Sequence, residues 1–377
     1  MHIDQVDKHA RAFEIRWSDG SKNTLPFIWL RDNDPNELHP QTHERTFDLS
    51  SVSLDIQPES YSLDESGLRV IWPNKESASH YSGEWLYEHR PGIPRPDAAR
   101  ITKKSWSEEN MSSLPRFDAQ ACHTSPKSLH DALVSLKTTG IILIDNLADD
   151  PMSGEEFGDL IGFKRESNYG VMFEVKSKPD PNNLAYTSLA LPLHTDLANQ
   201  EFVPGNQFLH CYRNNATGGE SLFADAMSIV DDFKVEHPQH YKLLCEAQVP
   251  WRFIDEKDDI RRHRPVINLD LSGDFVGLTF NAHLADVPDF DSDLMYDFYA
   301  AFRELMVSIR TAKYNIEYPL KNGEMVIFDN QRILHGRASF DANSGDRHLR
   351  GYYIEHNEID SRIRMLASQN NRIKGLS

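Results

Sequence analysis

The spacing of two histidines, an aspartate and an arginine constrains this chain more than any other feature of its sequence. His194-Thr195-Asp196 is followed 139 residues later by His335, and Arg347 stands twelve residues beyond that histidine. Alternate residues of an extended strand point to one side, so we expect His194 and Asp196 to face one ion while Thr195 faces away. Two imidazoles and one carboxylate, with one ligand supplied by a distant segment, are typical of the facial triad that holds non-haem Fe(II).

Arg347 adds a second chemical requirement to this motif. A planar guanidinium binds a carboxylate through two parallel hydrogen bonds, which suits the distal carboxylate of 2-oxoglutarate. Alone, His194-Thr195-Asp196 would indicate only a hydrogen-bonded histidine at the end of a strand. Thr217-Gly218-Gly219 also follows the motif, and glycines there would let a strand approach the pocket closely. Together these elements predict an iron site.

Composition narrows the partners that the chain can take. Its 377 residues suffice for two domains, and its net charge of −18 argues against nucleic acid and anionic membranes. No stretch approaches the ~20 apolar residues of a membrane span, and the N-terminus does not resemble a secretory signal. The three cysteines, Cys122, Cys211 and Cys245, form no CxxC pair, so we expect no disulfides and a cytoplasmic protein.

The chain divides into two expected regions, residues 1–98 and 99–377. The first is expected to be a small β-rich domain with strands at 12–17 and 68–72, and the breaker stretch 90–96 reads as a linker. In the second we expect helices at 128–138, 154–160 and 291–311, and strands at 140–145, 206–212, 220–224, 276–280, 325–328 and 349–354. This pattern favours a mainly β fold with supporting helices (α+β), whose catalytic domain is a double-stranded β-helix, or jelly roll.

With these motifs the chain resembles the Fe(II)/2-oxoglutarate-dependent dioxygenases of the γ-butyrobetaine hydroxylase branch, within the taurine-dioxygenase group. The resemblance extends over nearly the whole chain and rests on the segments Trp29–Asn33, Asn182–Thr187, Leu193–Asp196, Leu209–Cys211, Thr217–Gly219, Phe328–Asn330, Leu334–Arg337 and Arg347–Leu349. It implies Fe(II) on His194, Asp196 and His335. It also implies 2-oxoglutarate on Arg347 and Ser221, with O₂ as the other cosubstrate.

The same resemblance implies that the substrate is a small trimethylammonium compound such as γ-butyrobetaine, the precursor hydroxylated in carnitine biosynthesis. A quaternary ammonium donates no hydrogen bond, so aromatic ring faces hold it, each good contact contributing ~1–2 kcal/mol in a dry site. The matching rings are Tyr169, Phe173, Tyr186 and Tyr353, where Phe173 stands at a position that can carry tryptophan. Asn183 and Asn281 match the amide donors for the anionic end of the substrate.

Two departures from the family pattern leave details open. The family often carries a Cys₃His zinc site in the N-terminal domain, but the segment 32–40 contains no cysteine, so we expect no structural zinc and at most a weak Asp34/His39/His80 cluster. Leu197 follows the iron motif where some relatives have tyrosine, and Asn199, Gln200 and His283 add polar groups near the expected anion end. A phosphonate needs more donors than a carboxylate. The substrate therefore stays open between γ-butyrobetaine, 2-(trimethylamino)ethylphosphonate and trimethyllysine.

Two other classes of function are kept as alternatives. A non-catalytic jelly roll that binds quaternary ammonium compounds, as a sensor or carrier, would need neither the triad nor the distal arginine. A zinc- or manganese-dependent hydrolase would release no succinate from 2-oxoglutarate. The resemblance further implies a homodimer.

Overall fold

The computed structural model describes residues 1–73, 75–176 and 187–374, with side chains through residue 369. Contacts between residues divide the chain into two compact units, Met1–Asp97 (unit 1) and Ala98–Ser377 (unit 2). The boundary expected from the sequence lay between residues 98 and 99. No helix in the described residues has the length and apolar character needed to cross a bilayer.

Unit 1 contains two three-stranded antiparallel sheets around one apolar core. One sheet is formed by β1 (Ile3–Lys8), β2 (Ala12–Trp17) and β3 (Lys22–Pro26), the other by β4 (Ser60–Asp64), β5 (Gly67–Ile71) and β6 (Ser79–Ser82). Two short helices, α1 (Phe27–Asp32) and α2 (Gly83–Glu88), and the 3₁₀ turns Pro35–Glu37 and Leu49–Ser51 complete it. The alternation in β2 buries Phe13, Ile15 and Trp17 on one face, where they join the core.

The residues considered for a weak metal cluster in unit 1 make separate contacts. The buried carboxylate of Asp34 accepts hydrogen bonds from Lys75 Nζ and Ser79 Oγ. His80 Nε2 lies 2.9 Å from Ser66 Oγ, and His39 Nδ1 accepts the backbone N–H of Thr42 at 3.2 Å. The positive charges that face Asp34 therefore come from this chain, from Lys75 and from Arg31 Nη1 at 4.0 Å.

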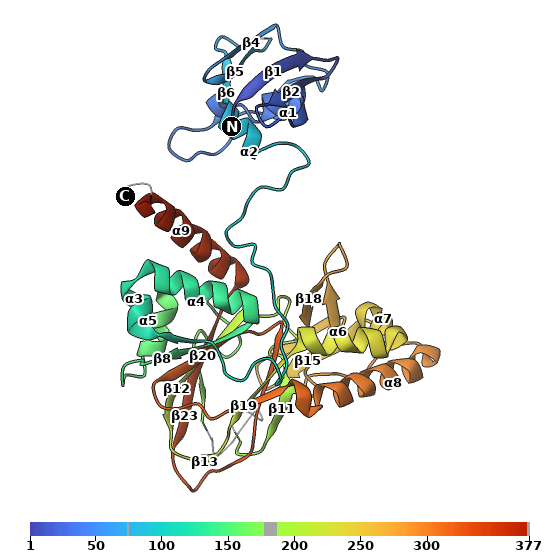
Figure 1. The fold of residues 1–377 in the computed structure, drawn as a ribbon. Helices are drawn as coiled ribbons and strands as arrows, with labels where there is room; N and C mark the ends of the chain where they lie inside the picture. Colours follow the sequence, from blue (N-terminus) through green and yellow to red (C-terminus); the bar gives the residue numbers. More distant parts are fainter. Residues whose placement is uncertain (74, 177–186, 375–377) are drawn as a thin grey trace. The chain divides into compact units, whose positions relative to one another are not determined.

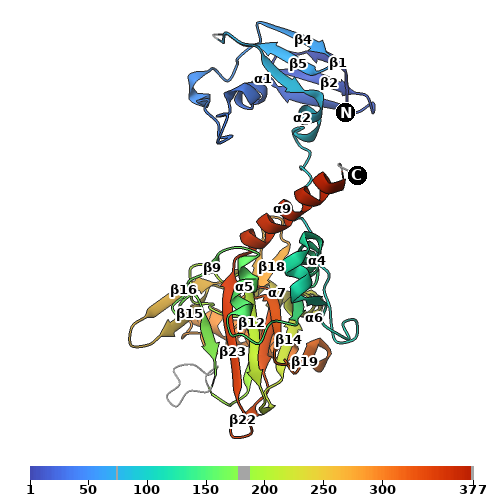
Figure 2. The same cartoon turned by 90° about the vertical axis from the view of Figure 1, so that its left-hand side faces the viewer.

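Unit 2 is strand-rich with a mixed α/β character, and two sheets form its centre (Figures 1 and 2). The large sheet has the order β10-β23-β12-β20-β8-β7, with β9 paired to β23, and all its pairs are antiparallel except β7–β8. The small sheet has the antiparallel order β11-β21-β14-β19. Phe223 of the small sheet and Phe328 of the large sheet pack with ring centroids 5.7 Å apart, within a cluster that joins the two. The strands are β7 (Arg116–Asp118), β8 (Ile141–Asp145), β9 (Lys164–Arg165), β10 (Phe173–Val175), β11 (Leu191–His194), β12 (Asn206–Asn214), β14 (Ser221–Asp225), β19 (Asn315–Tyr318), β20 (Glu324–Asp329), β21 (Ile333–Arg337) and β23 (Arg347–Ile354).

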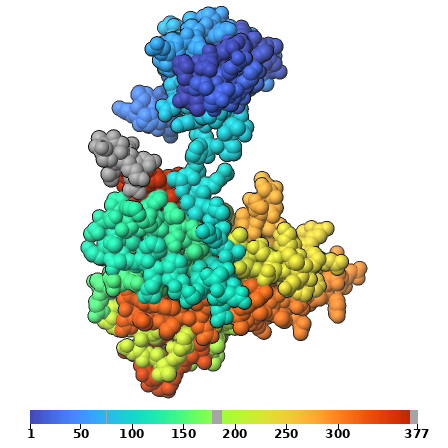
Figure 3. Space-filling model, in the orientation of Figure 1, coloured from blue at the N-terminus to red at the C-terminus, as the bar shows by residue number. Residues whose placement is uncertain are grey.

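Helices cover the sheets with two further apolar clusters. One set of helices packs on the outer face of the large sheet and consists of α3 (Ala119–Thr124), α4 (Pro126–Thr139), α5 (Ser153–Asp159) and α9 (His356–Lys374). In this cluster Leu133 and Leu136 of α4 meet Ile142 and Phe208 of the sheet. The second set, prominent in Figure 3 in yellow and orange, is α6 (Ala226–Glu236), α7 (Pro238–Glu246) and α8 (Ser292–Ile309). It packs with the hairpins β15 (Val249–Ile254)–β16 (Asp259–Arg264) and β17 (Ile267–Leu269)–β18 (Phe275–Leu278). The pair β13 (Thr217–Gly218)–β22 (Phe340–Asp341) lies apart from the larger sheets.

The expected elements occur with bounds shifted by a few residues, but the sequence did not indicate the helices α3, α6, α7 and α9 or several strands of unit 2, among them β11, β15, β16, β19 and β21. The expected helix 291–311 is α8, and the expected strand 276–280 is β18, which ends at Leu278. In α9 only a narrow stripe, Ile359, Ile363 and Leu366, is apolar in an otherwise polar segment. Such a stripe gives a weak sequence pattern, although it is enough to pack one side of the helix on α4.

A fully buried ion pair ties the small sheet to its surroundings. Arg332 Nε and Nη2 donate to the two carboxylate oxygens of Asp225 at 2.9 and 2.7 Å, and both side chains have no exposed surface. Arg332 also donates to the backbone oxygens of Thr138 and Lys104, at 3.0 and 2.5 Å. Asp225 in turn accepts the backbone N–H of Trp106 at 3.0 Å. The pair thus joins β14, the end of α4 and the segment before α3.

We expect Arg332→Met to destabilise unit 2 strongly, because it leaves the Asp225 carboxylate buried without its partner. Removing one partner of a buried pair costs about 3–5 kcal/mol. Urea titration of the variant would measure the change in the free energy of unfolding. Arg262→Met is the matched control, since Arg262 and Glu201 form a pair whose side chains are 45% and 58% exposed, and exposed pairs contribute about 0–1 kcal/mol. Equal losses in the two variants would contradict this role.

A buried histidine makes the stability of unit 2 depend on pH. Neither ring nitrogen of His210, on β12, has a hydrogen-bond partner among the described residues. Burial, together with the positive charges of Arg350 and His348, lowers the pKa of His210 to about 4. An unfolded histidine titrates near pH 6.5, so the unfolded state binds the proton first as the pH falls.

We therefore expect the contribution of neutral His210 to be complete above pH ~6.5 and to be lost as the pH falls toward ~4, a total of roughly 3 kcal/mol. Urea titrations at several pH values would follow this loss. His210→Gln should flatten the pH dependence, whereas His263→Gln, at a half-exposed histidine, should leave it as in the wild type. An unchanged profile for His210→Gln would show that other groups cause the dependence.

Candidate active site

The two histidines of the motif meet across neighbouring strands of the small sheet. In the antiparallel pair β11–β21, His194 stands directly opposite His335, and their ring centroids are 4.4 Å apart. The pairing brings together residues that are 141 positions apart in the sequence. Backbone hydrogen bonding between the two strands thus places two of the three expected metal ligands next to each other.

Asp196 does not lie in the strand, contrary to the expectation that His194 and Asp196 share one. β11 ends at His194, and Asp196 lies in the turn that follows, next to Leu197 with a φ of +57°. The turn is held because Thr195 faces away from the site. Its N–H donates to Phe280 O at 2.7 Å, and its Oγ1 accepts the N–H of Phe280 at 2.9 Å.

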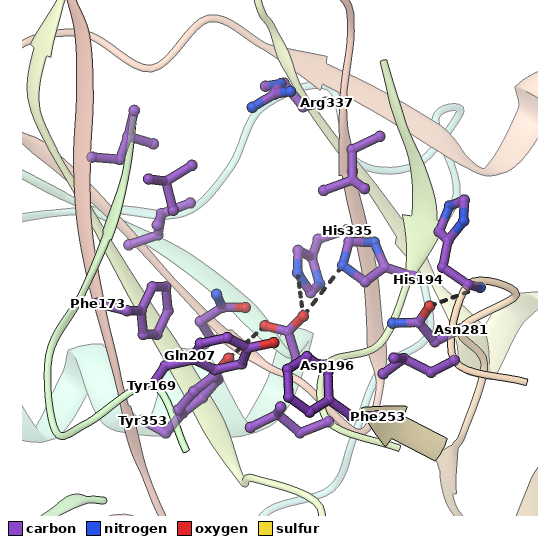
Figure 4. A pocket seen from close by; sticks show the side chains of 18 of the residues that line it. Tyr169, Phe173, His194, Asp196, Gln207, Phe253, Asn281, His335, Arg337 and Tyr353 are labelled. Carbon is purple, nitrogen blue, oxygen red and sulfur yellow. Dashed lines mark hydrogen bonds and ion pairs between the residues drawn. The ribbon is translucent and has the colours of Figure 1, made fainter. Parts of the chain in front are cut away.

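The carboxylate of Asp196 points at both imidazoles (Figure 4). Its Oδ1 is 3.2 Å from His194 Nε2 and 3.6 Å from His335 Nε2, and the three donor atoms all lie within 4.8 Å of one another. In the described part of the chain, this is the one group of histidine, cysteine or acidic side chains that could hold a metal. Two imidazole nitrogens and one carboxylate oxygen on one side of a pocket fit Fe(II).

Local electrostatics favour the protonation states that a metal needs. Burial opposes ionisation of Asp196, but the positive charge and hydrogen bonds of His335 and His194 outweigh it and hold the pKa of Asp196 well below its usual range. Burial lowers the pKa of His335, which favours its neutral imidazole. His194 Nδ1 lies 2.9 Å from Pro192 O, so a proton on Nδ1 leaves Nε2 free to bind an ion.

A cavity of about 520 Å³ adjoins the three side chains. Four aromatic rings form its wall beside Asp196: Tyr169, Phe173, Phe253 and Tyr353. Tyr169 and Phe253 pack with centroids 5.8 Å apart, and Phe173 and Tyr353 with centroids 5.3 Å apart. Phe173 reaches this position because Gly351 has no side chain: a Cβ there would lie 2.4 Å from the Phe173 ring.

Two arginines line the same cavity, and Figure 4 shows Arg337 well apart from the aromatic rings. Arg347 is buried, and in the described part of the chain no carboxylate forms an ion pair with it. Gly219 lets the backbone pass close to Arg347, since a Cβ there would lie 3.1 Å from Nε. Burial lowers the pKa of Arg347, and burial with the charge of Arg347 lowers the pKa of Arg337 to about 10. Both stay cationic at neutral pH, and a buried cation is stabilised by an anion.

Comparison with known proteins accords with this geometry. Residues 110–353 match the model of the taurine catabolism dioxygenase TauD, TfdA family, and residues 5–87 match the model named gamma-butyrobetaine hydroxylase-like, N-terminal. The chain belongs to the TauD/TfdA dioxygenase family. It is therefore an Fe(II)/2-oxoglutarate-dependent dioxygenase, as the sequence motifs predicted.

Three similar relatives are full-length matches to this dioxygenase. The gamma-butyrobetaine dioxygenase of Pseudomonas sp. (strain AK-1) is 36% identical, over 95% of this chain and 94% of the relative. The gamma-butyrobetaine dioxygenase of Homo sapiens is 28% identical, over 95% of each chain. The mitochondrial trimethyllysine dioxygenase of Bos taurus is 26% identical, over 96% of this chain and 87% of the relative.

The dioxygenase brings most of the expected site residues to one cavity. His194, Asp196, His335, Arg347, Ser221, Tyr169, Phe173, Asn281, His283 and Tyr353 all line it. Asn199 does not: it is fully buried and lies outside the cavity lining, which along this segment ends at Leu197. The expected residues Asn183 and Tyr186 lie outside the described residues.

Several lining residues of the dioxygenase were not found from the sequence, among them Gln207, Arg252, Phe253 and Arg337. Gln207 faces the cavity because it pairs with Tyr353 across β12 and β23. Phe253 and Arg252 come from the hairpin β15–β16, which the sequence did not indicate. Arg337 lies two residues after His335 on the same strand, so the alternation of β21 could have indicated it.

Proposed function

We propose that this dioxygenase hydroxylates a C–H bond of a small trimethylammonium compound such as γ-butyrobetaine. The observation that carries the proposal is the wall of four aromatic rings, Tyr169, Phe173, Phe253 and Tyr353, in the same cavity as the histidine–aspartate group. The 36% identity to a gamma-butyrobetaine dioxygenase over nearly the full chain supports it.

Two facing sheets that frame the cavity support a jelly roll for unit 2, with unit 1 as a small accessory domain.

In this proposal His194, Asp196 and His335 hold Fe(II), and the distal carboxylate of 2-oxoglutarate lies on Arg347 with Ser221 beside it. Bound Fe(II), with 2-oxoglutarate and O₂, supplies the oxidising power that replaces an unactivated hydrogen by hydroxyl, with release of succinate and CO₂. The chain's own part is to place one carbon of the substrate next to the metal. Arg347 suits its role because its guanidinium is buried, cationic and without a carboxylate partner in the described residues.

The two ends of the substrate are assigned to different walls. The trimethylammonium group packs against the aromatic rings, whose π faces attract a cation. Asn281 lies on the other side of Asp196 from Phe173 (Figure 4) and takes the anionic end together with His283, which also lines the cavity. Asn281 is held at both ends of its amide: its Oδ1 accepts the N–H of His283 at 3.1 Å and its Nδ2 donates to Thr195 O at 3.3 Å, which leaves one N–H of the amide for the substrate.

A second candidate substrate, 2-(trimethylamino)ethylphosphonate, is favoured by one observation. Arg252 and His283 line the cavity in addition to Asn281, so this wall carries more donors than a carboxylate uses. A phosphonate has a third oxygen and more charge. Arg252 Nε and Nη2 already donate to the two carboxylate oxygens of Asp259, at 2.9 and 3.1 Å. The charge of Asp259 therefore offsets part of the positive charge that Arg252 offers to a substrate.

The direct test is to supply Fe(II), 2-oxoglutarate and O₂ to the purified protein and to quantify succinate and hydroxylated product. We expect stoichiometric product from γ-butyrobetaine, with 2-(trimethylamino)ethylphosphonate and trimethyllysine compared in parallel. His194→Ala and Asp196→Ala are the inactive controls and should also lose Mn(II) binding. Turnover of none of the three substrates would contradict the proposal, and cleavage of a substrate without release of succinate would indicate a hydrolase.

Arg347→Ala should raise the KM for 2-oxoglutarate by more than about tenfold, because a charge-assisted bidentate contact contributes at least ~1.5 kcal/mol. The KM for the amine substrate should change much less. Initial rates with each substrate varied in turn would measure both constants. If only the KM of the amine substrate rose, Arg347 would bind the anionic end of the substrate, and 2-oxoglutarate would have to bind at Asn281 and His283.

Phe173→Leu tests the aromatic wall, because leucine keeps an apolar contact but removes the π face. We expect the KM of γ-butyrobetaine to rise by roughly 5- to 30-fold, equivalent to ~1–2 kcal/mol. The carbon isostere 5,5-dimethylhexanoate, in which a neutral tert-butyl group replaces the trimethylammonium group, serves as the matched ligand, and its competitive inhibition constant should change little. Equal losses for the cation and the isostere would argue for simple packing in place of a cation site.

The homodimer and the cytoplasmic location stay predictions, which sedimentation analysis and imaging of the tagged protein would test.

A further inference from the structure

Tyr353 belongs to the aromatic wall and also touches the carboxylate of the histidine–aspartate group. Its ring packs on Phe173 with centroids 5.3 Å apart, and its Oη donates a hydrogen bond to Asp196 Oδ2 at 2.7 Å. The side chain is buried, with 4% of its surface exposed. One residue therefore joins the wall expected to hold the substrate to the group expected to hold the metal (Figure 4).

The two oxygens of Asp196 have different surroundings as a result. Oδ1 faces the Nε2 atoms of His194 and His335, at 3.2 and 3.6 Å, whereas Oδ2 is taken by Tyr353. The backbone of Asp196 is held separately by Asn330, whose Oδ1 accepts the N–H at 2.8 Å and whose Nδ2 donates to the carbonyl at 3.3 Å. Asn330 sets where the residue stands, and Tyr353 sets how its carboxylate is turned.

Tyr353 is itself fixed by the large sheet. It stands opposite Gln207 of β12 and Arg165 of β9, so strands on both sides hold its backbone. A hydroxyl held in this way limits rotation of the Asp196 carboxylate about its last side-chain bond. A metal ligand whose orientation is preset binds with less loss of side-chain freedom, and hydrogen-bonding partners of ligands commonly contribute 10–100-fold in metal affinity.

We propose that Tyr353 is a positioning residue that holds Asp196 with Oδ1 turned toward the two imidazoles, so that the metal site and the aromatic wall keep a fixed relation. The inference rests on the proposed function in one respect, the assignment of Asp196 as a metal ligand. It adds a role for the hydroxyl of Tyr353 that is separate from the role of its ring. A substrate cation packed against this ring then stands at a set distance from the metal, which favours hydroxylation over unproductive decarboxylation of 2-oxoglutarate.

The test is Tyr353→Phe, which keeps the ring and removes only the hydroxyl. Mn(II) affinity of the full chain, measured from the EPR signal of free Mn(II) without substrate, should fall by about 10–100-fold. In turnover with Fe(II), the ratio of succinate to hydroxylated product should rise, while the KM of the amine substrate should stay near the wild-type value. Tyr352→Phe is the matched control. It removes a buried hydroxyl from the adjacent residue, whose Oη donates to Gly154 O at 2.6 Å away from the cavity, and should leave Mn(II) affinity unchanged.

Wild-type Mn(II) affinity in a folded Tyr353→Phe variant would overturn the proposal, as would an equal loss in Tyr352→Phe. Should Tyr353→Phe fold poorly, 4-aminophenylalanine at position 353 keeps both a ring and a donor, and it should restore Mn(II) affinity. Failure of that replacement to restore affinity in a folded protein would also overturn the proposal. Because Mn(II) binding is measured without substrate, a wrong substrate assignment does not affect it. Unchanged Mn(II) binding in Asp196→Ala would instead refute the ligand assignment of the proposed function.

Discussion

The pairing of β11 with β21 is the constraint on which the rest of the site depends. It sets His194 opposite His335 by backbone hydrogen bonds alone, and the turn after β11 then delivers Asp196 to the same place. A slip of one residue would turn the side chains of one strand to the other face of the sheet and separate the two imidazoles. Phe223 of β14, paired with His335 on the other side, packs on Phe328 of the large sheet and so anchors the pair in the core.

Charge is distributed unevenly around the cavity that this pairing creates. The chain carries a net charge of −18, yet two buried arginines, Arg337 and Arg347, line one part of the cavity. Burial lowers the pKa values of both, but an arginine side chain keeps its proton inside proteins, so this part of the cavity is suited to an anion. The aromatic wall suits a cation instead. In the proposed function, this polarity separates the trimethylammonium group of the substrate from the distal carboxylate of 2-oxoglutarate.

Supporting contacts hold both parts in place from outside the cavity. Thr195 fastens the turn to Phe280, Asn330 holds the backbone of Asp196, and the buried pair of Asp225 and Arg332 ties β14 to α4. These groups are all buried and hydrogen-bonded, so each adds rigidity at the cost of desolvation. A site that must aim one carbon at a metal gains from such rigidity, because small displacements reduce the rate strongly.

The sequence by itself indicated the two histidines and the aspartate that the structure brings together, the buried arginine of the same cavity, several central strands and the long amphipathic helix α8. Each of these is a local pattern: alternation, a helical stripe or a short motif whose chemistry follows from its residue types. Only the tertiary structure decided that Phe253 and Arg252 line the cavity, that Asn199 does not, and that the hydroxyl of Tyr353 meets Asp196. Local spacing specifies which residues share a face of a strand. Which face meets the site depends on the packing of strands and hairpins far apart in the chain, and no local pattern records that packing.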